Sequence, residues 1–502
     1  MKKTIIIATI IAALAIMIAV VLGFALGGDT SVKGTTGTSG TTADTTGAPT
    51  PKCEHTYEGG VCTLCGAEEP TAAEYFSFRL LDDGTYSIGA KLITELPERL
   101  IIPDTYEGKP VTTIRKKGFI GSKNIKYVYI HEGITTIEEE AFLECRNAAE
   151  IIFPASLEIV DDRAFENCDS VTEIAFKGEC VVLCERSFAG CDLLEKAVFE
   201  CSVQGEKGTL SAIFSDCKSL EIVDFKKGLL GKDDSDNSAV LYGTFQNCES
   251  LKSFTLPEGL GCISAYAFAG CTALESLVIP ETITRINMYA FLGCDKLLLS
   301  AKGENANLDI TARRVVDKLS KTLIWQGDAA PIPTDGSVIC IGQGAFEQNR
   351  EIAEIIIPPC VEAVEDSAFA KCENLKSVTW QSTQKHVPQM VFYNCIGLES
   401  VIFEEEITQI SSSAFNGCSA LKSFAIPEGV LELSSGAFKN CDSLETLRIP
   451  KSVTVIRHNA LVDCKYLSKI YYSGTTEEWN AIEKYNLRGA VTVYCTDGEV
   501  YL

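Results

Sequence analysis

The chain has 502 residues and a formal net charge of −24 at pH 7, with 22 cysteines but only four histidines. A surface this acidic repels a phosphate backbone, which argues against nucleic acid as a partner. The length alone would indicate three or four globular domains, but a short internal repeat replaces that expectation.

Residues 1–28 predict a single-pass membrane anchor. Lys2 and Lys3 precede the uncharged stretch Thr4–Leu26, which is long enough to cross a bilayer as a helix. The two lysines should stay inside the cell, so the rest of the chain is expected to form an extracellular ectodomain. The alternative is a signal peptide cleaved near Ala25–Gly27, which would leave a secreted protein.

Residues 29–52 predict a linker. They are rich in Thr, Gly, Ser and Ala and contain few apolar side chains. Such a segment cannot bury a core, so we expect a flexible tether between the membrane and the rest of the protein.

A small cysteine module, of the zinc-knuckle type, is predicted over residues 53–69. Cys62 and Cys65 form a Cys-x-x-Cys-Gly turn, and Cys53 and His55 could complete a tetrahedral set of ligands for one structural zinc ion. The module has too few apolar residues to fold unaided, so the metal would supply its folding energy. A disulfide with one free thiol is the alternative, because three cysteines cannot all pair with one another.

Residues 70–118 are expected to form an N-terminal cap and a first repeat. Two strand-like runs, Tyr75–Leu81 and Thr85–Ile88, flank Asp82–Gly84. An Asp-Gly pair between two such runs predicts a β-hairpin, which would cover the first exposed unit of the repeat.

The repeat proper is assigned to residues 119–472, where an aromatic residue returns every 23 positions. Insertions lengthen the interval to 26, 31 and 55 residues at three places. The column consists of Phe119, Phe142, Phe165, Phe188, Phe214, Phe245, Phe268, Phe291, Phe346, Phe369, Phe392, Phe415, Phe438 and finally Leu461. A fixed short period indicates a solenoid, because each unit buries its apolar face only against its neighbours.

The unit that contains Leu274, Leu277 and Ile279 has a Leu-x-x-Leu-x-Ile pattern, which is typical of a leucine-rich-repeat strand. In one unit, alternation along the strand directs Leu277 and Ile279 inward and Val278 outward. Asn287–Leu292 is expected to form a helical or 3₁₀ turn that carries Phe291 into the core. The fold class predicted is therefore an α/β repeat: a leucine-rich-repeat solenoid with a parallel, concave β-sheet.

Twelve cysteines follow the aromatic column by three residues, and Asn349 takes the same place in one unit. They are Cys145, Cys168, Cys191, Cys217, Cys248, Cys271, Cys294, Cys372, Cys395, Cys418, Cys441 and Cys464. A metal or redox function would need these thiols to converge on one place. A column with one member per unit instead predicts a ladder of buried, reduced thiols.

With these motifs in register, the stretch from about Tyr75 to Leu502 resembles the BspA-like, Treponema-type leucine-rich repeats of bacterial and protist surface proteins. The resemblance implies an extracellular, non-enzymatic protein that binds other macromolecules or cells.

Three insertions interrupt the period. Val203–Gly208 and Gly228–Asn237 are polar and glycine-rich, so loops are expected there. The enlarged unit at residues 292–345 holds three strand-like runs that resemble a strand-turn-strand variant of the family. These runs are Arg314–Lys318, Lys321–Trp325 and Asp335–Gly342.

Residues 473–502 are expected to form a C-terminal cap. Thr475 precedes an acidic first turn and predicts the N-cap of a short helix. Val491–Cys495 and Glu499–Leu502 flank Asp497-Gly498 and predict a closing hairpin.

No catalytic motif is present, and the four histidines lie in different units, so we expect no enzyme. The outward strand position is often apolar or aromatic, which is typical of a contact surface, although strand propensity alone also favours such residues. The predicted binding residues are Tyr129, Ile152, Val198, Val278, Ile356, Ile402, Arg448 and Tyr471. The expected partners are proteins or glycans on host or microbial surfaces, as for an adhesin; a structural cell-envelope protein without an external ligand is the alternative.

Overall fold

The structure is a computed structural model that describes residues 56–58, 61–62, 68–231, 239–485 and 491–502. The predicted anchor, the linker and the residues Cys53, His55 and Cys65 lie outside the described residues. Thr56–Leu502 forms one compact unit. Within its described residues, no helix combines the length and the hydropathy needed to span a bilayer.

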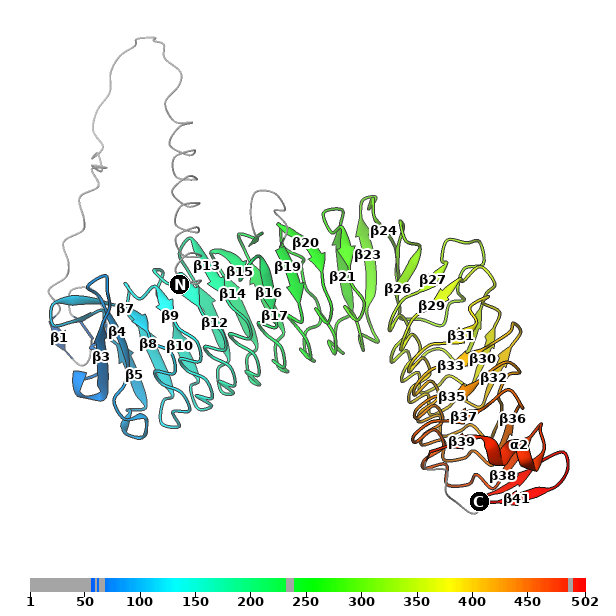
Figure 1. Ribbon diagram of the computed structural model, residues 1–502. Coiled ribbons are helices and arrows are strands. Elements are labelled where there is room, and N and C mark those ends of the chain that lie inside the picture. Colours follow the sequence, from blue (N-terminus) through cyan, green and yellow to red (C-terminus); the bar gives the residue numbers. More distant parts are fainter. Residues whose placement is uncertain (1–55, 59–60, 63–67, 232–238, 486–490) are drawn as a thin grey trace, which may run out of the picture. The chain divides into compact units, whose positions relative to one another are not determined.

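The units stack as a solenoid of parallel strands (Figure 1). Most units contribute one longer strand, here called a front strand, that carries the Leu-x-Ile pattern. Leu277 and Ile279 are buried and Val278 is 52% exposed, so the predicted alternation is confirmed. The front strands are β5 (Arg99–Ile102), β8 (Tyr127–Ile130), β10 (Glu150–Ile152), β12 (Glu173–Phe176), β14 (Lys196–Phe199), β17 (Ile222–Phe225), β21 (Ser276–Pro280), β23 (Leu298–Lys302), β28 (Glu354–Ile357), β30 (Ser377–Trp380), β32 (Ser400–Phe403), β34 (Ser423–Ala425), β36 (Thr446–Ile449), β38 (Lys469–Tyr472) and β40 (Thr492–Tyr494).

A second set of strands, here called back strands, forms further parallel sheets that the sequence interpretation did not include. Many of them are only two residues long and direct one apolar side chain into the core, as Val160 does in Ile159-Val160. They are β7 (Lys109–Ile114), β9 (Thr136–Ile137), β11 (Ile159–Val160), β13 (Cys180–Leu183), β15 (Ser202–Gly205), β18 (Leu229–Leu230), β16 (Thr209–Ser211), β19 (Ala239–Tyr242), β20 (Leu260–Ile263), β22 (Arg285–Ile286), β27 (Cys340–Ile341), β29 (Ala363–Val364), β31 (His386–Val387), β33 (Gln409–Ile410), β35 (Glu432–Leu433), β37 (Val455–Ile456) and β39 (Glu483–Lys484).

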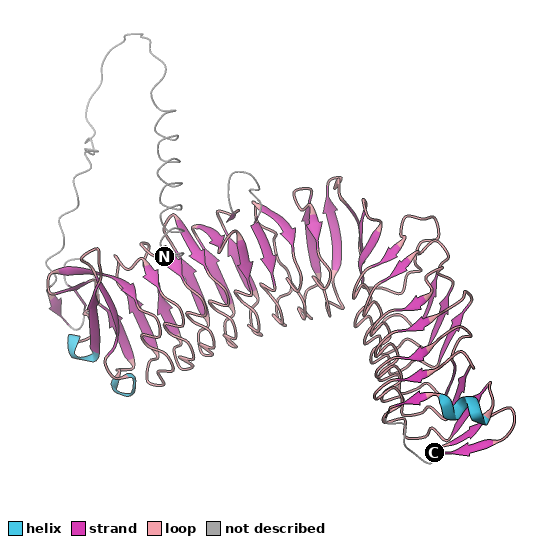
Figure 2. Cartoon of the chain, viewed as in Figure 1, coloured by secondary structure: helices cyan, strands magenta, loops and turns pink. Residues whose placement is uncertain are grey.

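The α/β assignment was wrong. Figure 2 shows strands and turns through the repeats, and Asn287–Leu292 is a succession of turns. In the described part of the chain, helix is confined to α2 (Thr476–Ala481) and the 3₁₀ segments η1 (Ala73–Tyr75) and η2 (Ile93–Glu95). The 23-residue unit is filled by two strands and tight turns, which leaves no length for a helix.

Main-chain hydrogen bonds hold the turn segments of successive units together. The Phe119 N–H donates to the Ala141 carbonyl at 2.8 Å, and the Phe438 N–H donates to the Ala460 carbonyl at 2.9 Å. In each of these bonds the N–H belongs to one unit and the carbonyl to the next unit along the chain. The residues two before and two after the aromatic have positive φ, as Arg163 and Asn167 do. The aromatic rings follow the same stacking: the ring centroids of Phe142 and Phe165 lie 5.1 Å apart.

The cysteine column is buried from Cys145 to Cys441, as predicted, and its last member, Cys464, is half-buried. Each Sγ donates to the carbonyl of the aromatic residue in the preceding unit. Cys271 Sγ lies 3.0 Å from the Phe245 carbonyl oxygen, and Cys464 Sγ lies 3.1 Å from that of Phe438. Burial raises the pKa of the Cys145 thiol to about 12. The cysteines from Cys145 to Cys495 are all free thiols, so the predicted ladder of reduced cysteines is confirmed in the structure.

The enlarged unit forms an antiparallel sheet of β24 (Leu308–Thr311), β25 (Arg314–Asp317) and β26 (Thr322–Gln326), and β26 pairs in parallel with β27. The strand-turn-strand prediction is therefore confirmed. Two hydrophobic clusters meet here: one extends from Phe76 to Trp325 and the other from Val316 to Val493.

The first polar insertion was wrongly assigned to a loop. Ser202–Gly205 is the strand β15, which pairs with β13 and β18. Val203 is fully buried, so one apolar residue among polar neighbours is enough for a back strand. Part of the second insertion lies outside the described residues.

Both predicted caps are present. The N-terminal hairpin pairs β3 (Phe76–Leu80) with β4 (Tyr86–Ala90). At the other end, Thr475 and Glu478 form a capping box at the start of α2, and β41 (Glu499–Tyr501) pairs antiparallel with β40.

Candidate ligand-binding face

The candidate site is a row of outward side chains at the centres of the front strands, here called the exposed row. In β28, Ile355 and Ile357 are buried on either side of Ile356, which is 57% exposed. Strand register sets Ile356 beside Thr379 and Thr379 beside Ile402. Since neighbouring strands lie about 4.8 Å apart, such side chains form one surface.

All eight predicted binding residues occupy this outward position, but they fall into separate groups. Tyr129 is the register partner of Ile152, and Arg448 is the partner of Tyr471. Ile356 and Ile402 share one neighbour, as described above. The other two stand apart from these groups: Val198 lies beside Asp224 and Val278 beside Ser300.

The exposed row has one further aromatic member that the sequence interpretation missed. Tyr494 of β40 is the register partner of Tyr471, and the two rings stack with centroids 5.1 Å apart. The Arg448 guanidinium lies 5.0 Å from the centre of the Tyr471 ring. Tyr494 follows Tyr471 by 23 residues, so the repeat period was the signal that could have found it.

The segment after the cysteine module is fixed to the first units. Glu68 Oε1 accepts hydrogen bonds from Arg99 at 2.5 Å and from the Tyr127 hydroxyl at 2.8 Å. His131 Nε2 lies 3.1 Å from the Glu68 carbonyl oxygen. Burial, and next the bond to Glu68, raise the pKa of Tyr127 to about 12. Glu68 therefore lies beside Tyr127 and His131, which precede and follow Tyr129, the first predicted member of the exposed row, by two residues.

The predicted zinc ligands are described only in part. Cys62 ends β2 (Val61–Cys62), which pairs antiparallel with β1 (Tyr57–Glu58), while Cys53, His55 and Cys65 lie outside the described residues. A short hairpin that ends at a cysteine is compatible with a Cys-x-x-Cys turn. The zinc site stays a prediction.

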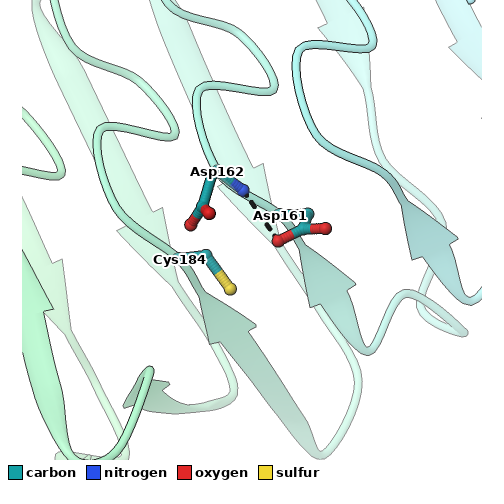
Figure 3. A group of neighbouring side chains, drawn as sticks. All are labelled: Asp161, Asp162 and Cys184. Carbon is teal, nitrogen blue, oxygen red and sulfur yellow. Dashed lines mark hydrogen bonds between the residues drawn. The ribbon is translucent and has the colours of Figure 1, made fainter. Parts of the chain in front are cut away.

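Asp161, Asp162 and Cys184 form a different cluster of potential metal ligands, with ligand atoms within 4.8 Å of one another (Figure 3). Their oxygens already bind the main chain. Asp161 Oδ1 accepts the Asp162 N–H at 2.9 Å, and Asp162 Oδ1 accepts the Glu185 N–H at 3.1 Å. Elsewhere Glu138 accepts the Lys116 N–H in the same way. The cluster is thus explained by the capping of turns between units.

Comparisons with known proteins agree with this architecture. The chain is similar to a leucine rich cell surface protein from Faecalibacterium prausnitzii A2-165, with 26% identity, a TM-score of 0.56, and coverage of 82% of this chain and 97% of that one. It is also similar in fold to a leucine-rich repeat protein from Bacteroides ovatus ATCC 8483, with 23% identity, a TM-score of 0.50, and coverage of 85% and 100%.

Among curated proteins, none matches the chain. A family model described as the BspA type leucine rich repeat region, with six copies, matches residues 112–234, 214–302 and 339–468. These ranges include more than half of the sequence. The chain therefore belongs to the family of BspA-type leucine-rich-repeat proteins.

Proposed function

We propose that the protein is an anchored, adhesin-like cell-surface protein without enzymatic activity. Its exposed row would bind protein or glycan ligands on host or microbial surfaces. The observation that carries this proposal is the alignment of Ile356 and Ile402, each 57% exposed, on either side of Thr379. The similarity to a bacterial cell surface protein supports the location.

The energetic argument starts from the cost of leaving isoleucine in water. Fully burying an isoleucine contributes roughly 1.5–3 kcal/mol, so covering the 57% that is exposed contributes about 1–1.5 kcal/mol for each residue. Apolar groups near the centre of an interface dominate its binding energy. Ile356 and Ile402 are flanked on the same face by Glu354 and Ser400, which are exposed and polar. An apolar centre with a polar border is the usual composition of a binding interface.

The test uses the purified full-length chain on three probes: immobilised extracellular-matrix proteins, a glycan array, and fixed epithelial and bacterial cells. The double variant Ile356→Asp, Ile402→Asp should lose binding to whichever probe the wild type binds. Its thermal unfolding should change little, because neither side chain belongs to the core.

His386→Asp, Gln409→Asp is a matched control, since both side chains are exposed and are register partners on the back strands β31 and β33. It should retain binding. If the isoleucine double variant binds as well as the wild type, the exposed row is not the ligand site. If the wild type binds no probe and fractionates with the cell wall, the protein has a structural role in the envelope.

The N-terminal part of the proposal concerns attachment and metal. Residues 1–28 would hold the chain in the membrane, and the alternative of cleavage would release it. Protein that stays in the membrane fraction after an alkaline wash supports the anchor. The module around Cys62 would hold one structural zinc ion, with no part in ligand binding.

A further inference from the structure

The C-terminal front strands carry two cations that have no carboxylate as a register neighbour. Lys469 of β38 is flanked in register by Thr446 and Thr492. The matching lysine of the N-terminal half, Lys196, is flanked by Glu173, and the two side chains form an ion pair at 2.5 Å. At this repeat position, the lysine of the N-terminal half is paired with a carboxylate, whereas Lys469 of the C-terminal half has no acidic register neighbour.

Arg448 completes the pair of cations. Its register neighbours are Ala425 and Tyr471, neither of which is acidic. Across the described residues, neither Arg448 nor Lys469 has an ion-pair partner. Uncompensated cations on adjacent strands of a chain with a net charge of −24 mark a place where an anion is attracted locally.

Glu499 is an acidic residue of the terminal hairpin beside these strands, and it is already engaged. It pairs with Tyr494 across the terminal hairpin, and its Oε2 accepts a hydrogen bond from the Tyr501 hydroxyl at 2.8 Å. The anionic partner is therefore expected from outside the chain.

The remaining side chains of this face indicate what kind of anion it would take. In the exposed row, Arg448 is followed by Tyr471 and Tyr494, whose rings stack. Lys469 lies between Thr446 and Thr492, which each present a hydroxyl. Arginine and lysine bind carboxylates through charge-assisted hydrogen bonds. Tyrosine and threonine hydroxyls can exchange hydrogen bonds with the hydroxyls of a sugar.

An acidic peptide fits this face less well. Peptide recognition depends on apolar anchor pockets or on a free strand edge along the bound chain. The outward residues of β36, β38 and β40 are hydroxyl-bearing, cationic or aromatic, and these strands are paired on both sides. Hydroxyls interspersed with cations and rings match a polyhydroxylated ligand better.

We propose that Arg448, Lys469, Tyr471 and Tyr494 bind an anionic oligosaccharide whose sugar residues carry carboxylates. This inference rests on the proposed function and names a ligand class for one end of the exposed row.

The experiment measures binding of the purified full-length chain to immobilised polygalacturonate by biolayer interferometry, with dextran as the neutral sugar and poly-L-glutamate as the acidic peptide. We expect binding to polygalacturonate that weakens as salt is raised. The double variant Arg448→Gln, Lys469→Gln should lose at least about tenfold in affinity, because two charge-assisted contacts are removed. Lys196→Gln is the matched control and should bind like the wild type.

Three results would overturn the inference: no binding to polygalacturonate, equal binding by the double variant, or equal or tighter binding to poly-L-glutamate. The isoleucine variant separates the two proposals. If cell-surface binding depends on Ile356 and Ile402 while polygalacturonate is not bound, only the present inference fails. If polygalacturonate is bound through Arg448 and Lys469 while the isoleucine variant has no effect, the apolar site fails and the anionic one stands.

Discussion

Asn349 takes the place of a cysteine in the cysteine column, as Ser122 does in the first unit, and it should contribute more stability than any of the thiols. Its Nδ2 donates to the carbonyls of Gln326 and Asp328, both at 3.0 Å. Its Oδ1 accepts the N–H groups of Glu351 at 2.8 Å and Ile352 at 3.1 Å. The side chain thus joins the enlarged unit to the next regular unit, where the two hydrophobic clusters meet.

Asn349→Ala removes all four of these bonds. Each net hydrogen bond contributes about 0.5–1.5 kcal/mol, and buried main-chain groups left without a partner cost more, so we expect a loss of about 3 kcal/mol. Asn349→Cys restores only the Sγ donor that the cysteines of the other units supply, and its loss of stability should be smaller than that of Asn349→Ala. Asn374→Ala is the control: its Nδ2 makes one exposed bond to the Arg350 carbonyl, so its effect should stay below about 1 kcal/mol.

The assay is urea unfolding followed by tryptophan fluorescence, since Trp325 and Trp380 lie on either side of position 349. Asn349→Ala should shift the earliest transition to lower urea concentration. Equal midpoints for Asn349→Ala and Asn374→Ala would refute the argument that this side chain holds the junction together.

Four further results are expected. Cys372, Cys395, Cys418, Cys441 and Cys464 should react with a thiol reagent only after denaturation; disulfides mapped between adjacent members would contradict this. Burial raises the pKa of Cys464 from 9.0 to about 11. The stability contributed by the protonated thiol should therefore be complete below pH 9 and be lost as the pH rises to about 11. An unfolding free energy that stays constant over that interval would contradict this prediction. Lys484→Met should cost about 1 kcal/mol and speed amide exchange in α2, because Lys484 Nζ donates to the carbonyls of Trp479 and Ile482; unchanged exchange would exclude this role. Elemental analysis should find one zinc per chain, lost in Cys62→Ser and Cys65→Ser; protein without zinc and with Cys53 in a disulfide would refute the metal site.

The features that recur in every unit could be predicted from the sequence, because the same residue types return at the same positions. The inward direction of Leu277, Ile279 and Phe291, the cysteine column and both hairpins follow from spacing and alternation. The helix expected at Asn287–Leu292 was wrong, since hydrophobic spacing over six residues does not distinguish a helical turn from a chain of tight turns.

The back strands were missed because many of them are only two residues long. A back strand such as Ile159-Val160 is too short for an alternation pattern, and Val203 is the one large apolar residue in a polar run. For the candidate site, sequence correctly placed Arg448 and Tyr471 outward. The missing ion-pair partner of Lys469 became visible only when strand register identified its neighbours.

The hydrogen bonds between neighbouring units determine how the protein should respond to mechanical load. They run from each turn segment to the next, as from Phe119 to Ala141, so a force that pulls the two ends apart along the stack would open one unit at a time. Each regular unit would release 23 residues, or about 75–80 Å of extended chain. The force–extension curve should therefore show a series of equal short steps, with one longer step where the enlarged unit unfolds.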